Sequence, residues 1–285
     1  MNFITHLKQL LFKYKQAALL GVLLSIILSI LSIVTESNYK IVIYLVTMIC
    51  AFLISEFIFF TGKFRFNDWK IKQPKRELYI ILCIQIVVSV LFIYWFTISK
   101  GQQENNIVRT IVLAGRILFA FPIFILIYFI GVKKYSFKQL GILSFNNWYV
   151  SVPIIIIIGA ATYLTFPESL QFKDVLKQNG ISAFITLGFL TAAIPEEITR
   201  VLLQSRLSRV LKNKSWGWFL ASLIWALLHI PTFARGSSNY FDATCGALAI
   251  LPIGLLWGYL NERYKSIIPA VLIHGTNLWG LQHIF

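Results

Sequence analysis

Charged residues, and acidic ones above all, are scarce in this sequence. Only 13 % of the 285 residues are charged and Asp and Glu number 11 together, whereas 58 % of the residues are hydrophobic. This composition excludes an ordinary soluble domain and is typical of a protein with several membrane-spanning helices. The shortage of acids leaves a net charge of +15. Because the cations lie in short loops between apolar runs, and not on one amphipathic face, we expect no nucleic-acid partner.

Cysteine is also scarce. Cys50, Cys83 and Cys245 each lie within an apolar run, and their spacing is neither paired nor of a metal-binding type. The sequence therefore supports neither a disulfide framework nor a structural zinc site built from cysteine. We interpret the three thiols as small residues of the helix packing.

Long apolar runs divide the chain into segments of membrane-spanning length. A bilayer core of about 30 Å requires a helix of about 20 apolar residues. The expected fold class is therefore all-α, a polytopic transmembrane helical bundle. The first run is too long for a signal-peptide core and no cleavage motif follows it, so we interpret it as a retained helix. Windows of this length predict about nine helices, near residues 17–35, 41–61, 78–98, 110–132, 148–166, 181–206, 216–232, 243–261 and 266–284.

The distribution of Lys and Arg predicts the orientation of the bundle. Cytoplasmic loops carry an excess of these residues. A cytoplasmic N-terminus and an external C-terminus place most of the 26 cations inside, in clusters at 8–15, 63–76, 133–138, 206–214 and 263–265. We expect two parts, N-terminal membrane helices of unknown role at 1–135 and a core at 136–285 that holds nearly all intramembrane polar residues. Glu56 and Arg116 lie in spans outside this core, and we interpret them as snorkelling or mutually paired structural charges.

Two adjacent carboxylates follow one of the apolar runs. Residues 181–194 are apolar enough to span much of a bilayer, and Glu196 and Glu197 come directly after them. Ionisable groups at that depth are costly and need partners. On a helix Arg200 lies four residues from Glu196 and three from Glu197, so its guanidinium can reach either carboxylate. The pattern fits both a functional site and an ion pair that merely ends a helix.

His229 lies in the next span, and its position predicts a meeting with Glu196. The turn between these two spans centres near Lys212. At 1.5 Å per residue, Glu196 and His229 both lie about 24 Å from that turn, at the same level of a helical hairpin. Trp225 precedes His229 by four residues on the same face and could form the wall of a pocket. A lone histidine or tryptophan at such a position is also an ordinary core residue.

A second histidine, His274, lies in the last predicted span, and Asn277 follows it by three residues on the same face. Carboxylates, histidines, an arginine and an asparagine on three spans suggest activation of water for hydrolysis. In one alternative a desolvated glutamate and a histidine form a general base, and an imidazole and an amide face the oxyanion. In the other, Glu196, His229 and His274 are a ligand set that zinc accepts. The two alternatives stay open, although no HExxH motif is present.

These motifs resemble those of the CAAX-protease and bacteriocin-processing membrane proteins, the CPBP or Abi family, which includes the CAAX prenyl endopeptidases. The resemblance covers roughly residues 136–285 and lies in three signatures, a glutamate pair followed by arginine, an aromatic residue four before a histidine, and a histidine followed by asparagine. It implies an intramembrane endopeptidase in which Glu196 is the activating carboxylate with His229. It also implies that Glu197 and Arg200 support Glu196, and that His274 and Asn277 stabilise the oxyanion.

Two spacings depart from the family pattern. Arg200 follows Glu197 by three residues and Asn277 follows His274 by three, whereas the family has four in both places, and each shift turns a side chain by about 100° around its helix. The main alternative is therefore a non-catalytic membrane scaffold or immunity protein of the same fold. A transporter with a proton relay is a further alternative, but it predicts repeated halves, and no internal repeat is visible.

The resemblance also implies a partner and a location. We expect a membrane-anchored peptide or protein as substrate, presented in the lipid bilayer, with a role in peptide processing, export or bacteriocin self-immunity. The Lys, Asn, Ile and Phe-rich composition is typical of an AT-rich bacterial genome. This favours a multi-pass protein of a bacterial plasma membrane, where prenylated proteins are not expected.

Overall fold

Helices make up all the regular structure that the computed structural model describes, and these residues contain no strand. The all-α membrane-type fold expected from the sequence is confirmed. The described residues are 2–15, 19–20, 23–24, 27, 38–64, 66, 69–99, 122–142, 145, 147–165, 180–182, 184–234 and 240–277. Arg116, most of the predicted span 17–35, the first part of 110–132 and the last part of 266–284 lie outside them.

Within the described part of the chain, four helical segments are long and apolar enough to cross a membrane. They are Lys40–Thr61, Trp148–Thr165, Lys214–Phe233 and Tyr240–Tyr264. These bounds closely match four of the predicted spans, because each span is a continuous apolar run that ends at charged or polar residues. The count of nine spans stays a prediction.

The helices follow one another in a simple order along the chain. The bounds are α1 (Phe3–Lys13), α3 (Asn38–Thr61), α4 (Pro74–Ser99), α6 (Ile123–Leu126), η1 (Ile127–Val132), η2 (Trp148–Val150), α7 (Ser151–Thr165), η3 (Ile185–Ala193), α9 (Ile194–Val210), α10 (Lys214–Leu227), α11 (Ile230–Phe233), α12 (Tyr240–Ala249), α13 (Leu251–Tyr264) and α14 (Ile268–Asn277).

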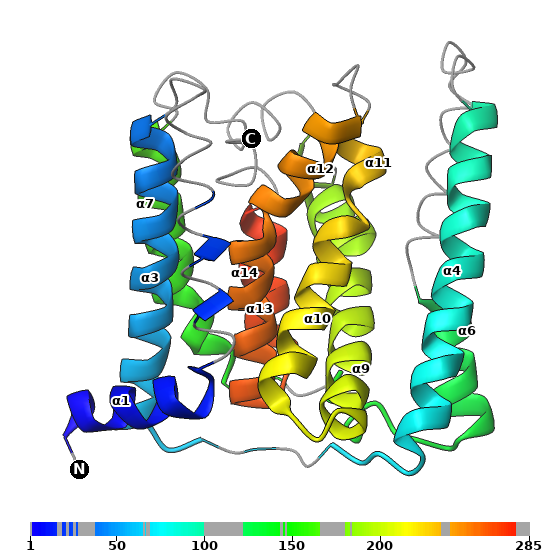
Figure 1. The fold of residues 1–285 in the computed structure, drawn as a ribbon, viewed down its shortest axis with the longest axis horizontal. Coiled ribbons are helices and arrows are strands. Elements are labelled where there is room, and N and C mark those ends of the chain that lie inside the picture. The colour runs from blue at the N-terminus through cyan, green and yellow to red at the C-terminus, as the bar shows by residue number, and fades with distance from the viewer. Residues whose placement is uncertain are drawn as a thin grey trace.

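Helices α13 and α14 stand in the middle of the bundle. Figure 1 shows α3 and α7 on one side of them, α9 and α10 on the other, and α4 with α6 at the far edge beyond α9. The short helix α1 lies across the lower end of the bundle in that view, below α3. The site described below is therefore built on helices that have neighbours on several sides.

Two clusters of buried apolar side chains hold these helices together. The first joins α3 and α7 to α10, α13 and α14, with Trp257 fully buried in it. The second joins α4, α6 and η1 to α9 and α14, around Leu202 and Phe129. The outer faces remain apolar, as with Val46 on α3 and Ile86 on α4, because lipid and not water faces them.

Small residues bring α13 close to its neighbours. A Cβ atom at Gly254 would lie 2.6 Å from Trp225 Cε3, and one at Gly258 would lie 3.0 Å from Gln204 Oε1. Glycine at these positions allows the backbone of α13 to approach α9 and α10. The absence of a side chain at Gly254 leaves room for the Trp225 ring and the Arg200 guanidinium.

Buried ion pairs join helices that are distant in the sequence. The Glu56 carboxylate on α3 accepts hydrogen bonds from Arg263 Nε at 2.8 Å and Nη2 at 2.9 Å. His6 Nε2 on α1 lies 2.8 Å from the same carboxylate. Glu56 is therefore a paired structural charge, and Arg263 is its partner among the described residues; whether it also pairs with Arg116 stays a prediction, since Arg116 lies outside the described residues.

A second buried pair attaches α4 to α9. Arg206 Nε donates to Glu77 Oε2 at 3.1 Å, and Tyr135 Oη donates to Glu77 Oε1 at 2.7 Å. Burial, together with the hydrogen bond to Glu77, raises the pKa of Tyr135 to about 12, so the phenol remains a donor at neutral pH. This contact fixes the lower part of α4 beside the core.

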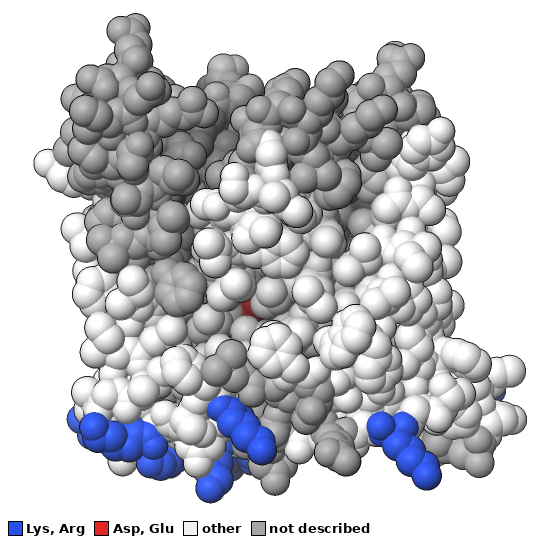
Figure 2. Space-filling model, turned by 180° about the vertical axis from the view of Figure 1, so that it is seen from behind, with Lys and Arg blue, Asp and Glu red and all other residues white. Residues whose placement is uncertain are grey.

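Most of the described Lys and Arg side chains on the face shown in Figure 2 gather at one end of the molecule, which we call the cationic end. Figure 1 shows α1, the 62–73 segment, the α9–α10 turn and the α13–α14 turn all at this end. In Figure 2 the blue side chains lie along the same lower edge, and the face above them is almost free of described charge apart from one recessed acidic patch. The bundle is thus polarised along the direction of its long helices.

Candidate active site

The two adjacent carboxylates lie where a wider helix passes into an α-helix. The π-helix η3 (Ile185–Ala193) continues directly into α9, with Glu196 and Glu197 in the first turn of α9. Pro195 lacks a backbone N–H and cannot continue the hydrogen bonding of the preceding turn. A π-helical segment inside a longer helix is frequent at functional sites, because the wider turn changes the direction in which the following side chains point.

Glu197 is the buried centre of a hydrogen-bond network. Its side chain is 0 % exposed, and it accepts from Arg200 Nε at 3.2 Å and from Asn261 Nδ2 at 2.7 Å. His274 Nδ1 lies 3.2 Å from Glu197 Oε1. A carboxylate that accepts from charged and amide donors is an ionised acceptor, so Nδ1 of His274 carries the proton in this contact.

Arg200 fastens this network to α10 and α13. Its Nη1 donates to the carbonyl oxygen of Gly254 at 3.0 Å, and its guanidinium lies 4.3 Å from the centroid of the Trp225 ring. The spacing of three residues from Glu197 does not prevent pairing, because the long guanidinium side chain bridges the offset. Arg200 therefore neutralises one of the two adjacent carboxylates.

His274 is held in place from two sides. Its ring stacks on Trp257 at a centroid distance of 3.9 Å with 13° between the planes, and Glu197 holds Nδ1. The other ring nitrogen, Nε2, lies 3.6 Å from Glu196 Oε2. The imidazole thus connects the buried carboxylate of Glu197 to the more open one of Glu196.

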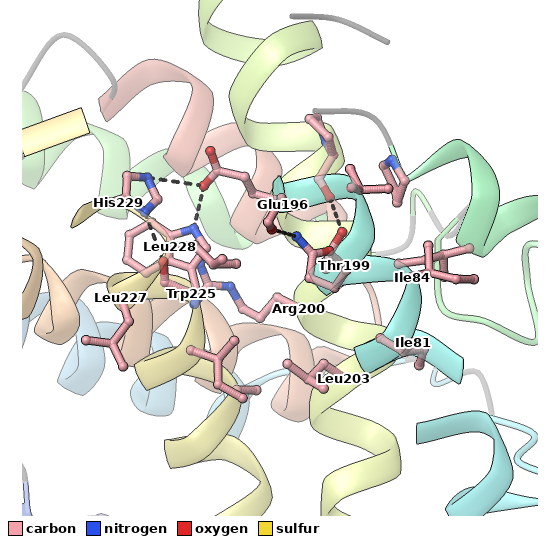
Figure 3. Close-up of a pocket in the computed structure, with 18 of the residues that line it drawn as sticks. Ile81, Ile84, Glu196, Thr199, Arg200, Leu203, Trp225, Leu227, Leu228 and His229 are labelled. Carbon is pink, nitrogen blue, oxygen red and sulfur yellow. Dashed lines mark hydrogen bonds and ion pairs between the residues drawn. The ribbon is translucent and has the colours of Figure 1, made fainter. Parts of the chain in front are cut away.

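Glu196 and His229 face each other at the edge of a groove (Figure 3). His229 Nε2 lies 3.8 Å from Glu196 Oε2, and the Glu196 and His229 side chains are 26 % and 24 % exposed. His229 Nδ1 lies 2.9 Å from the carbonyl oxygen of Trp225, which can only accept, so Nδ1 is the donor. In the neutral imidazole Nε2 then presents its lone pair to Glu196 and the groove.

The groove itself is apolar and runs between two pairs of helices. Its volume is about 560 Å³, with α9 and α10 on one side and α4 and α6 on the other. Ile81, Ile84 and Leu203 are among its apolar lining residues. Glu196, Arg200 and His229 are the predicted site residues that line it. A hydrophobic segment can lie in such a groove with a carboxylate and an imidazole beside it.

The predicted site residues occupy two layers. Glu196 and His229 face the groove, while Glu197 and His274 lie behind them and are buried. Asn277 is also buried, 2 % exposed, as the last residue of α14, one turn beyond His274. The bonds described above bring the two glutamates, Arg200 and the two histidines together, and Asn277 takes no part in those bonds.

Two residues of the network were not predicted from the sequence. Asn261 binds Glu197, and Trp257 stacks on His274. Both lie on α13, and the only signal for Asn261 was a single amide in a long apolar run. Such a residue is common at helix interfaces, and its direction depends on how α13 is rotated, which hydropathy does not show.

The arrangement does not fit the zinc alternative. Among the described residues, no group of three or more His, Cys, Asp and Glu side chains is arranged to hold a metal ion. Glu196 Oε2, the carboxylate atom that lies near both His229 and His274, also accepts a hydrogen bond from Trp225 Nε1. No step of the mechanism proposed below therefore passes through a metal.

Comparison with known families places the site in a matched region. Residues 178–279 match the family described as type II CAAX prenyl endopeptidase Rce1-like, and this stretch contains every predicted site residue. This part of the chain is therefore similar to the Rce1-like family. Neither the curated proteins nor the solved structures give a match to the chain.

The Rce1-like match confirms the resemblance predicted from the three motifs. The matched region covers the helices from η3 to α14, all of those that carry the hydrogen-bond network. The family is one of proteases, which supports a hydrolase that acts within the membrane on a peptide or protein. Helices α1, α3, α4 and α7 lie outside the matched region, although α3 and α7 share a core with it.

Proposed function

We propose that the protein is an intramembrane endopeptidase that hydrolyses a peptide bond of a membrane-presented substrate. The observation that carries this proposal is the pairing of Glu196 Oε2 and His229 Nε2 at the edge of the apolar groove, 3.8 Å apart. Two acceptors at this separation suit a water molecule that donates one hydrogen to each. A carboxylate and an imidazole so arranged remove a proton from the water as it attacks a carbonyl carbon.

Trp225 supports this chemistry by orienting the two residues of the outer layer. Trp225 donates to Glu196 and its carbonyl oxygen fixes the ring of His229, so a single residue positions both members of the pair. His274 lies within reach of an oxyanion that forms beside Glu196, because its Nε2 is 3.6 Å from that carboxylate. We propose that His274 stabilises the oxyanion in its protonated form.

His274 lies between the two carboxylates, with Nε2 3.6 Å from Glu196 Oε2 and Nδ1 3.2 Å from Glu197 Oε1. We propose that Asn277, one turn away on α14, supports this end of the site, as the family resemblance implies.

The substrate class follows from the groove. Its apolar walls suit an apolar or lipid-modified segment that enters from the bilayer, with the bond to be cleaved beside Glu196. We propose a bacterial plasma-membrane location and a role in peptide processing, export or self-immunity to bacteriocins. The support for this role is the composition and the resemblance of the motifs.

The test is cleavage in liposomes that contain the purified full chain. Two probes are used, a farnesylated peptide with a C-terminal CAAX sequence and an unmodified apolar transmembrane peptide, and products are identified by mass spectrometry. We expect Glu196→Gln to lower the cleavage rate at least about a hundredfold, because the general base is lost. The control is Asp242→Asn, which removes an exposed carboxylate of α12.

The results separate the proposal from its main competitor. Cleavage by the parent protein and by Asp242→Asn, but not by Glu196→Gln, supports the endopeptidase. Equal cleavage by all three proteins contradicts the role of Glu196. Measured metal content in active protein, with activity lost on chelation and restored by zinc, would contradict the metal-free mechanism.

One observation favours the second candidate, a non-catalytic scaffold of the same fold. Trp225 Nε1 already donates to Glu196 Oε2, so one lone pair of the proposed base is occupied. A binding protein with this site would retain both peptide probes in the groove without cutting them. Retention with no product from either probe, under conditions in which the purified chain is folded, would favour this function.

A further inference from the structure

A second cavity lies at the cationic end of the bundle, apart from the groove. It has a volume of about 590 Å³ and is formed where α9 and α13 end, where α10 begins, and where the 69–71 segment crosses them. None of its lining residues belongs to the active-site network. The proposed protease mechanism therefore leaves this cavity without a role.

The lining of this cavity is strongly cationic. Arg209, Lys212, Lys214 and Lys265 all line it, and Glu262 is the one carboxylate among its described lining residues. Glu262 Oε1 lies 3.2 Å from Lys214 Nζ and 2.7 Å from Lys265 Nζ, so two lysines share one acid. A large excess of positive charge remains, and Arg209 and Lys212 form no ion pair with a described residue.

Lys265 lies deepest among these cations. Its Nζ lies 4.2 Å from the centroid of the Trp69 ring, and its side chain is 25 % exposed. Burial lowers the pKa of Lys265, Glu262 opposes this effect, and Lys214 and Arg209 add to the lowering. The cations of the cavity thus repel one another, and an anion between them relieves that repulsion.

Three of the cations occupy positions that do not favour a lysine. Lys212 and Lys265 have positive φ angles of 51° and 52°, a region in which a helix usually ends with glycine or asparagine. Lys214 is the first residue of α10, where the helix dipole favours a negative charge. Only at Lys214 does the charge itself oppose the helix dipole, and a bound anion would offset that part of the cost.

The position of the cavity along the membrane-spanning helices indicates the source of the anion. The apolar spans Lys214–Phe233 and Tyr240–Tyr264 begin and end at its lining, so Lys214 and Lys265 mark the end of the apolar stretch. Phosphate groups of phospholipids lie at this level of a membrane, and basic pockets between helices bind them.

We propose that this cavity is a binding site for a phosphate group, supplied by the headgroup of an anionic phospholipid. The lysines and Arg209 surround the phosphate, and the N-terminus of α10 faces the same space. Bound lipid would connect the ends of α9, α10 and α13, which are the helices that carry Glu196, Trp225 and Asn261 at the active site. The site is independent of the proposed protease activity.

The test measures lipid binding to the purified full chain in a neutral detergent. Short-chain phosphatidylglycerol, short-chain phosphatidylcholine and inorganic phosphate are titrated separately, and binding is followed by native mass spectrometry and by the unfolding temperature. The variant is Arg209→Gln with Lys212→Gln, because both side chains are exposed and form no ion pair with a described residue. The matched control is Lys75→Gln with Arg76→Gln, two exposed cations of α4 outside the cavity.

We expect phosphatidylglycerol to bind the parent protein and the control equally, and the cavity variant about tenfold or more weakly. Phosphatidylcholine should bind all three proteins alike and more weakly. Equal loss in the control and the cavity variant would overturn the proposal, because general surface charge then explains the binding. Loss of inorganic phosphate binding alone, with phosphatidylglycerol unaffected, would keep the phosphate site and overturn the lipid source.

Discussion

Arg200 combines several contacts that only a guanidinium can make at once. Its Nε binds Glu197, its Nη1 binds the Gly254 carbonyl oxygen, and its flat face lies over Trp225. Lysine is long enough to pair with Glu197, but its single ammonium group cannot reach the carbonyl oxygen at the same time, as a branched guanidinium can. We expect Arg200→Lys to lower the free energy of unfolding by about 1.5–3 kcal/mol, measured by thermal or SDS unfolding.

The control for this substitution lies on the same helix. Arg209 is exposed at the last turn of α9, so Arg209→Lys should leave stability unchanged. Cleavage should fall for Arg200→Lys and not for Arg209→Lys, since only Arg200 holds the carboxylate that orients His274. Equal behaviour of the two variants would show that the buried guanidinium has no special role.

At the level of single residues, helical spacing predicted two contacts that the structure contains. The pairing of Arg200 with Glu197 follows from helical spacing, and the approach of His229 to Glu196 follows from equal distances to one turn. The contacts of Asn261 and Trp257 did not follow, because they depend on the rotation of α13 about its axis. The sequence shows which residues share a face of one helix. The direction in which a third helix points its side chains depends on packing, which the sequence does not show.

At the level of the helix, α13 is the element whose close approach assembles the site. A Cβ atom at Gly254 would lie 2.6 Å from Trp225 Cε3 and 3.2 Å from Arg200 Nη1. We expect Gly254→Ala to cost about 1–3 kcal/mol in unfolding free energy, since rigid rings cannot move aside cheaply. Cleavage should fall as well, because Trp225 positions both Glu196 and His229.

Gly159 on α7 provides the matched control. A Cβ atom there meets nothing within 4 Å, so Gly159→Ala should be neutral or stabilise the helix by up to about 1 kcal/mol. Both changes replace a helical glycine by alanine in an apolar helix. A loss of stability at Gly159 equal to that at Gly254 would contradict the packing argument.

Helix boundaries were predictable where apolar runs end at charges, and less so elsewhere. The predicted span 41–61 corresponds to Lys40–Thr61, and 148–166 to Trp148–Thr165. The predicted span 181–206 is a π-helix followed by α9, a change of winding that the apolar pattern does not reveal. The amphipathic helix α1 was not predicted, because it lies across the end of the bundle and is shorter than a span.

At the level of the whole molecule, the Glu77–Arg206 pair decides whether α4 remains a wall of the groove. Both side chains are buried, and removing one partner of such a pair costs about 3–5 kcal/mol. We expect Glu77→Leu to lower the unfolding temperature and the rate of cleavage together. Adding Arg206→Met should restore part of the stability, because no buried charge is then left alone. No recovery in the double variant would show that the pair itself, and not the unpaired charge, matters.

The polarity of the bundle makes a prediction about sidedness. The cationic end carries α1, the α9–α10 turn and the α13–α14 turn, and the positive-inside rule predicts that it faces the cytoplasm. Two exposed residues at opposite ends test this, Lys138 after η1 and Tyr240 at the start of α12. In a variant in which Cys50, Cys83 and Cys245 are replaced by alanine, Tyr240→Cys should react with a membrane-impermeant maleimide in intact cells. Lys138→Cys should react only after the cells are permeabilised. The reverse pattern would place the cationic cavity outside the cell, where the phosphate site would face the outer leaflet.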